Sequence, residues 1–476
     1  MLAVNIALRG SPSSLVAVAP RSTLRSVRAE PSPDKDGPAP AHDTGIVLLS
    51  PAYLSLLLLA ALLGIPISFA AFGFLVVVHE LEHALWDSLP TTLGFDTPPA
   101  WWAIATIGFA GLLVGLSVRY LPGRAGHVPA AGLSADASNA SALPGVILAA
   151  VASLSFGAVL GPEAPLIAIG GGLALLAANR TRISDDPRAS ALIVATGSAA
   201  AIAAIFGNPL VAAIIFLEIV GLSRGQTLLV VVPCMVSSGV GALVFTGLGD
   251  WTGLEIGALA IPDLEPANLE VSDLLLSFPL AAAVAVGVSV VFVIGRWTAA
   301  VADAWPRAAP VVAGLTAGGS AALYSMLSSH SPEDVALSGQ VTLETLAGNP
   351  EQWSAEALAL LLLCKGFSYA LCLGAFRGGP VFPAAVLGAA AGVLAGAWLP
   401  GIATVSGIAV GMAAGVAAVT RLPVTSTVLV VLLLGAAAMS LMPVVILAVI
   451  TAMICAEALS RVAIPNRGDG EVMSHE

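Results

Sequence analysis

Apolar segments near the length that spans a bilayer as a helix follow one another from about Leu48 to Ala463, and Gly and Pro interrupt them repeatedly. The chain contains 49 Gly and 32 Pro among 476 residues. A helix broken at membrane depth leaves backbone N–H and C=O groups unpaired, and these are tolerated only where they are buried in protein or line a polar cavity. With 58% hydrophobic and 10% charged residues, the sequence predicts an all-α polytopic membrane protein whose broken and re-entrant helices surround a pore or a binding site.

The charged residues are few, and their distribution excludes one class of partner. The formal net charge is −11 and Lys and Arg form no cluster, which argues against binding to nucleic acid. The four Cys form no CxxC pair, so they predict neither a disulfide scaffold nor a metal centre, and we expect no cofactor. Arginines in residues 1–45 and 180–188 predict a cytoplasmic side, whereas the acidic segments 250–273 and 333–356 are expected to face outward.

The chain divides into a polar start, a long apolar domain and a short polar end. Residues 1–45 are rich in Ser, Pro, Ala and Arg without a sustained apolar period, so we expect a disordered cytoplasmic tail. An organellar targeting segment is the alternative, because such segments are also rich in Arg and Ser. We expect the membrane domain to span 46–465 and a C-terminal tail to follow at 466–476.

The stretch VVVHELEHALW contains His79, Glu80 and His83 in the H-E-x-x-H spacing of a zinc metalloprotease helix. His residues at i and i+4 can bind one zinc, and the Glu can act as general base. A catalytic zinc needs a third protein ligand, and no later apolar segment clearly supplies one. We therefore favour a polar helix end at the membrane interface, anchored by Trp86, and keep an intramembrane zinc protease as a remote alternative.

Two pairs of similar segments recur in the two parts of the chain. GSAAAIAAIFGNP at 197–209 and GMAAGVAAVTRLP at 411–423 share a Gly, a small-residue helix and a Pro at the same spacing. GPEAPLIAIG at 161–170 and GPVFPAAVLG at 379–388 share G-P-x-x-P followed by Gly. Ordered pairs of Gly/Pro-interrupted segments favour a transporter with internal repeats. We place the halves at about 50–225 and 270–463.

Three Gly/Pro loops open onto apolar helices, at 123–132, 160–172 and 376–388. The first N–H groups of a helix are unpaired and the dipole is positive there, so helix N-termini can replace the water that an anion loses in a bilayer. If the three N-termini converge, they form an anion site made of backbone. The candidate anion-binding residues are Ala125, Gly126, His127, Val128, Gly161, Pro162, Gly379, Pro380, Val381 and Phe382. For His127 the alternative is a loop histidine facing water.

Glu163 lies in one of these Gly/Pro turns, at the start of an apolar run. A carboxylate at membrane depth is costly and marks a functional site by default. In its ionised form it can occupy the positive end of its own helix and compete with an external anion. Protonation or displacement would free the path, so we predict that Glu163 is a gate that responds to pH and to anion concentration.

Four segments, in order, resemble the CLC family of voltage-gated chloride channels and chloride/proton antiporters. GPEAPLIAIGGG resembles the family's gating-glutamate segment, 196–218 its Phe-Asn-x-Pro turn and glutamate-bearing helix, 361–388 its Lys-bearing helix and anion loop, and 420–435 its R-x-P-L-T stretch. The resemblance covers about 65–463. It implies a CLC-type fold of two inverted repeats, a homodimer with one ion pathway per subunit in the plasma membrane, and transport of chloride or related small anions, possibly with protons.

The sequence also departs from the family pattern. The first loop reads RAGHVP at 124–129, so the family's filter serine is missing, and no Tyr follows Tyr369 where the family has a late tyrosine. Val381 stands where the family usually has Phe. These differences predict a looser central anion site.

Glu218 is the other carboxylate well inside an apolar segment, and the resemblance places it on the inner pathway. Antiporters of the family tend to carry two successive glutamates at this point, whereas here Ile219 follows Glu218. Without that second carboxylate a proton has no obvious inner donor. The sequence therefore favours a gated channel, with a chloride/proton antiporter as the alternative.

Overall fold

The computed structural model describes residues 49–132, 140–180, 187–220, 224–254, 261, 264, 266 and 268–463. The tails predicted at 1–45 and 466–476 lie outside these residues. Contacts divide the chain into residues 1–59 and 60–476, and all the packing and the site described below belong to the second unit. Within the described residues every named element is a helix, and the prediction of an all-α protein is confirmed.

The helices of the first half of the chain are α3 (Pro51–His83), α4 (Leu89–Thr92), α5 (Trp102–Tyr120), α6 (Leu143–Ser155), α7 (Glu163–Asn179), α8 (Pro187–Phe206), α9 (Pro209–Val220) and α10 (Arg224–Thr252). Those of the second half are α11 (Val271–Ala304), α12 (Ala309–Ser328), α13 (Gln340–Gly348), α14 (Ala355–Ala375), α15 (Val381–Trp398), α16 (Thr404–Thr420), α17 (Pro423–Leu433) and α18 (Ala438–Ala463). A 3₁₀ turn, Pro332–Asp334, follows α12.

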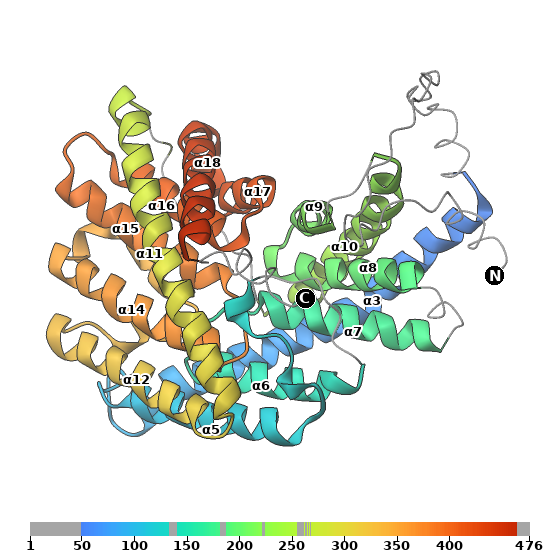
Figure 1. Cartoon of the computed structure of the whole chain (residues 1–476), viewed down its shortest axis with the longest axis horizontal. Coiled ribbons are helices and arrows are strands. Elements are labelled where there is room, and N and C mark those ends of the chain that lie inside the picture. The colour runs from blue at the N-terminus through green and yellow to red at the C-terminus, as the bar shows by residue number, and fades with distance from the viewer. Residues whose placement is uncertain are drawn as a thin grey trace, which may run out of the picture. The chain divides into compact units, whose positions relative to one another are not determined.

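The order of helix lengths recurs in the two halves. α7 has 17 residues and α15 has 18, α9 has 12 and α17 has 11, and α10 has 29 and α18 has 26. The paired sequence segments fall at equivalent junctions, since Pro209 begins α9 and Pro423 begins α17. α7 packs against α8 as α15 packs against α16 (Figure 1). The similar segments of the sequence therefore mark similar structural units.

Glycine allows the helices in these pairs to approach closely. A Cβ on Gly388 would overlap the Gly411 carbonyl, and one on Gly411 would overlap the Gly388 carbonyl. Gly170 of α7 and Gly197 of α8 have the same mutual relation in the first half. Because lipid gives apolar helices little reason to associate, close backbone packing between small residues holds such pairs together. This explains much of the glycine content.

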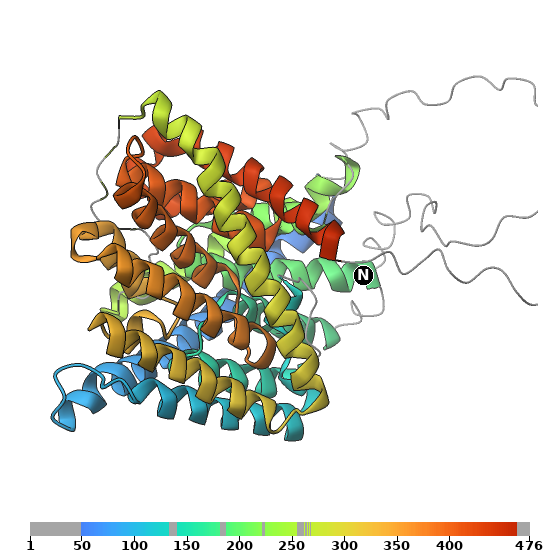
Figure 2. The ribbon, with the colours of Figure 1, turned by 60° about the vertical axis from the view of Figure 1, so that its left-hand side comes forward.

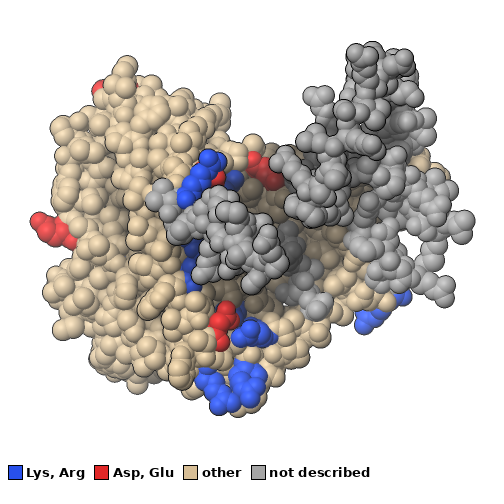
Figure 3. All heavy atoms as spheres, in the orientation of Figure 1, with Lys and Arg blue, Asp and Glu red and all other residues tan. Residues whose placement is uncertain are grey.

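Nine of the described helices are long and apolar enough to cross a membrane, which supports the assignment as a multi-pass membrane protein. Five apolar helices are shorter, and α7, α9 and α17 are among them. The longest helix of the second half, α11, packs against α14, α16 and α18 (Figure 2). Few charged side chains interrupt the described surface in the view of Figure 3. Short helices among long ones are the broken segments that the Gly and Pro pattern predicts.

The H-E-x-x-H motif lies at the end of α3, with His79, Glu80 and His83 exposed. Among the described residues no group of three His, Cys, Asp or Glu side chains could hold a metal ion, so the protease alternative has no support. The prediction that Trp86 anchors at the interface is wrong. Its side chain is 1% exposed and its Nε1 donates to the Ser155 carbonyl at 3.3 Å, because a short π-helix, Ala84–Ser88, turns the ring into the core.

Candidate anion site

Two of the three Gly/Pro loops meet directly. Gly161 and Gly379 form an isolated antiparallel bridge, in which the Gly161 N–H donates to the Gly379 carbonyl at 2.7 Å and the Gly379 N–H donates back to the Gly161 carbonyl. α7 begins at Glu163 and α15 at Val381, directly after the paired loops. The N-termini of one helix from each half therefore start side by side.

The Glu163 side chain lies across this junction. Its Oε1 accepts a hydrogen bond from the backbone N–H of Phe382 at 3.0 Å. A Cβ on either Gly161 or Gly379 would overlap the Glu163 carboxylate, so glycine at both positions makes room for it. The residue is 2% exposed. The carboxylate thus occupies a buried position framed by backbone of both loops.

The electrostatics of this position suit an anion. The carboxylate is in the first turn of α7 and is held by an N–H in the first turn of α15, and both helix ends carry partial positive charge. Its Oε2 has no hydrogen-bond partner among the described residues. An unpaired buried acceptor is costly, so this oxygen is the natural place for a proton or for a competing ligand to act.

Tyr369 of α14 supports the second loop, although the sequence analysis noted it only as the last tyrosine. Its hydroxyl donates to the Pro380 carbonyl, and its side chain is fully buried. Phe206, at the end of α8, stacks on Phe382 with ring centroids 6.2 Å apart. Both contacts join segments far apart in the chain, so no local sequence signal reveals them.

The first Gly/Pro loop reaches the others through Arg377, a residue that the sequence analysis missed. Arg377 Nη2 donates to the Arg124 carbonyl at 3.2 Å and Nη1 to the Phe376 carbonyl at 3.0 Å. Ala125 is buried, Gly126 and Val128 are half-buried, and His127 is exposed. The His127 Nε2 pairs with the Gly132 carbonyl at 2.8 Å, within its own loop. The Arg377 side chain, and not His127, joins this loop to the site.

Glu218 lies near the C-terminal end of α9, and its environment differs from that of Glu163. Its Oε1 accepts from the Val424 N–H at 2.8 Å and its Oε2 from the Thr425 N–H at 2.7 Å. These are unpaired donors at the N-terminus of α17. Glu218 therefore caps a helix of the second half from α9 of the first half.

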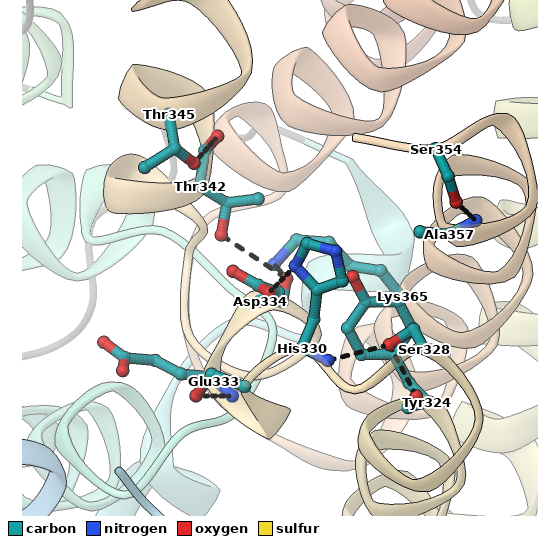
Figure 4. Close-up of polar contacts among 11 residues, drawn as sticks. Tyr324, Ser328, His330, Glu333, Asp334, Thr342, Thr345, Ser354, Ala357 and Lys365 are labelled. Atoms are coloured by element: carbon teal, nitrogen blue, oxygen red, sulfur yellow. Dashed lines mark hydrogen bonds and ion pairs between the residues drawn. The ribbon is translucent and has the colours of Figure 1, made fainter. Parts of the chain in front are cut away.

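A polar cluster surrounds the 3₁₀ turn after α12. His330 Nδ1 lies 3.7 Å from Asp334 Oδ2 (Figure 4). The His330 ring stacks on Trp353. Burial raises the pKa of Asp334 to about 6, against the opposing effect of His330 and Lys365. Burial, together with the nearby carboxylates of Asp87 and Asp334, raises the pKa of Glu333 to about 7. Both carboxylates would change charge at mildly acidic pH.

Comparisons with known proteins agree with this geometry. A family model described as voltage gated chloride channel matches residues 110–457. The ion-transport protein YfeO of Salmonella newport (strain SL254) is 38% identical over 165 residues, which cover 34% of this chain and 39% of that protein. The YfeO protein of Salmonella paratyphi A (strain ATCC 9150 / SARB42) is 36% identical over the same length. The matched part thus spans about two fifths of these relatives.

Solved structures show the same fold. A slow cyanobacterial Cl⁻/H⁺ antiporter superposes with a TM-score of 0.68 at 18% identity, covering 85% of this chain and 94% of that chain. A CLC-type fluoride/proton antiporter gives a TM-score of 0.65 at 15% identity, with 86% and 96% covered. The chain belongs to the CLC family of voltage-gated chloride channels and transporters, and it has the CLC fold of two inverted repeats.

Proposed function

We propose that the protein conducts chloride or a related small anion along a path through each subunit, and that the Glu163 carboxylate gates this path. The observation that carries the proposal is the position of that carboxylate. It accepts a hydrogen bond from Phe382 N–H at the paired N-termini of α7 and α15, where it occupies the place that a permeant anion would take.

The gate follows from competition for one set of donors. An anion and the ionised Glu163 carboxylate cannot both occupy the space over Gly161 and Gly379, because the carboxylate already fills it. Protonation removes the charge that the helix ends attract and weakens the bond to Phe382. Low pH or a high anion concentration is therefore expected to open the path.

The environment of Glu218 favours passive conduction over exchange with protons. Both of its oxygens accept backbone N–H groups at the start of α17, where the positive end of the helix dipole holds the side chain as a cap. Ile219 follows it, so no second carboxylate is adjacent. A chloride/proton antiporter remains the alternative, since the similar structures are those of antiporters.

The proposal also includes the oligomeric state of the protein and the membrane that holds it. Resemblance to the family favours a homodimer in the plasma membrane. Exposed apolar side chains on α10 and on α18 are candidates for contact with a second copy, among them Leu243 at 76% exposure and Met439 at 80%. The same side chains can face lipid, so cross-linking in a bilayer is the suitable measurement of the dimer.

Purified protein in liposomes tests the function directly. We expect chloride efflux well above that of empty liposomes. The reversal potential should follow the chloride gradient and should not depend on an imposed pH gradient. A reversal potential displaced by the pH gradient in a fixed ratio would instead establish the antiporter. No efflux of chloride, fluoride or nitrate would reject anion transport.

A further inference from the structure

One face of α14 carries three buried polar side chains. Lys365, Tyr369 and Cys372 follow one another at i, i+4 and i+7, which places them on the same side of the helix. All three are fully buried. The opposite face of the same helix carries Leu363 and Phe367, which are 71% and 43% exposed. We name the first three residues the α14 stripe.

Lys365 holds the segment that follows the 3₁₀ turn. Its Nζ lies within 3.0 to 3.4 Å of four consecutive backbone carbonyls, those of Asp334, Val335, Ala336 and Leu337. Gly339, with a φ of +89°, packs directly against the same ammonium group. A buried charge is tolerated only when it is hydrogen-bonded, and these carbonyls supply that. Lys365 therefore fixes this backbone segment to α14.

That segment is in turn bonded to the loop that carries the gate. The Leu337 N–H donates to the Gly157 carbonyl at 3.0 Å. Two residues further on, the Val159 N–H donates to the Sγ of Cys372 at 3.4 Å. Residues 157–161 lead straight into Glu163. Cys372 thus holds the loop before α7 directly, and Lys365 holds it through the 334–337 segment.

Tyr369, the third member of the α14 stripe, holds the loop before α15. The Tyr369 hydroxyl donates to the Pro380 carbonyl, two residues before the N–H of Phe382 that binds Glu163. The bridge between Gly161 and Gly379 then closes the ring of contacts. Cys372 and Tyr369 are bonded to backbone before and after the carboxylate, and Lys365 acts through the 334–337 segment. These hydrogen bonds go to backbone and not to the carboxylate itself.

From these contacts we infer that the α14 stripe positions the gate: it sets the spacing between the two loops and thereby the strength with which Glu163 docks on Phe382 N–H. This inference rests on the proposed function of Glu163. Its consequence is that loosening the stripe releases the carboxylate more easily. The effect on anion flux must then depend on Glu163 being present.

Tyr369→Phe is the sharpest test, because it removes one hydroxyl and keeps the ring in its place. Loss of a single hydrogen bond of typical strength is expected to raise chloride efflux at neutral pH about fivefold. The double variant Tyr369→Phe/Glu163→Gln is expected to transport as Glu163→Gln does, because the docked carboxylate is already absent. Efflux of all three variants is measured in liposomes at equal protein content.

Tyr324→Phe is the matched control, since Tyr324 is another fully buried tyrosine, and its ring packs near His330 instead of the gate loops. It should leave efflux unchanged. An equal change of flux by Tyr369→Phe with and without Glu163, or no change in either, would overturn the inference.

If Tyr369→Phe does not fold, Cys372→Ala and Cys372→Ser decide. Cys372→Ser retains an acceptor for Val159 N–H and should restore wild-type gating, whereas equal behaviour of the two overturns the inference.

The failure of this inference can be told apart from failure of the proposed function. Absence of wild-type anion efflux, or efflux indifferent to Glu163→Gln, rejects the gate itself. Efflux that responds to Glu163→Gln but not to changes in Tyr369 or Cys372 rejects only the positioning role.

Discussion

Glu163→Gln is expected to raise chloride efflux at neutral pH to the level that the wild-type protein reaches only in acid. Glutamine has the shape of the protonated side chain and is neutral. It therefore lacks the charge that the helix ends of α7 and α15 attract. Losing a charge-assisted hydrogen bond to Phe382 N–H corresponds to roughly a tenfold to hundredfold change in the occupancy of the gate. Efflux from liposomes across a range of pH measures this.

A small pH dependence should persist in the variant. Glu333 and Asp334 have pKa values raised to about 7 and about 6, so they lose negative charge as the pH falls through that range. A less negative surrounding favours anion entry, and efflux should rise slightly. Glu356→Gln, at an exposed position, is the matched control and should keep the wild-type pH profile. An unchanged, steep profile in Glu163→Gln would contradict the gate.

Gly379→Ala is expected to block the path. The added methyl group would overlap the place that a Glu163 carboxylate oxygen now occupies, which is also the proposed position of the anion. Such overlap costs about 1–3 kcal/mol, or roughly a tenfold to hundredfold loss of flux. Because the methyl excludes the anion as well as the carboxylate, Glu163→Gln should not restore transport in the double variant.

Gly287→Ala supplies the comparison, since a Cβ there meets no atom within 4 Å, and its flux should match the wild type. Both variants are first checked for monodispersity and thermal stability, so that a folding defect is not mistaken for a blocked path. Full recovery of flux by Glu163→Gln in the Gly379→Ala protein would show that the glycine makes room for the gate alone.

Local signals were sufficient to predict much of the fold and the two helix starts beside Glu163. Gly-Pro before an apolar run marks a helix start, and this pattern located α7 and α15 with Glu163 at the first position. The recurrence of that pattern predicted related halves, and the two loops lie side by side in the structure. Such features depend on a few neighbouring residues, so a single sequence can reveal them.

The supporting residues depend on long-range packing and could not be predicted. Lys365 bonds to carbonyls about thirty positions earlier, and Arg377 to the carbonyl of Arg124. Trp86 looked like an interfacial anchor because aromatic residues gather there, yet the turn after α3 buries it. Glu218 stood out as a carboxylate in an apolar segment, but the helix end that it caps lies in the other half of the chain.

The position of a bound halide tests the central claim most directly. Bromide, located by anomalous diffraction in crystals of Glu163→Gln, should appear within hydrogen-bonding distance of Phe382 N–H, where the wild-type protein at neutral pH should show none. Bromide in the same place in both proteins, or in neither, would contradict a carboxylate that competes with the anion for the paired helix ends.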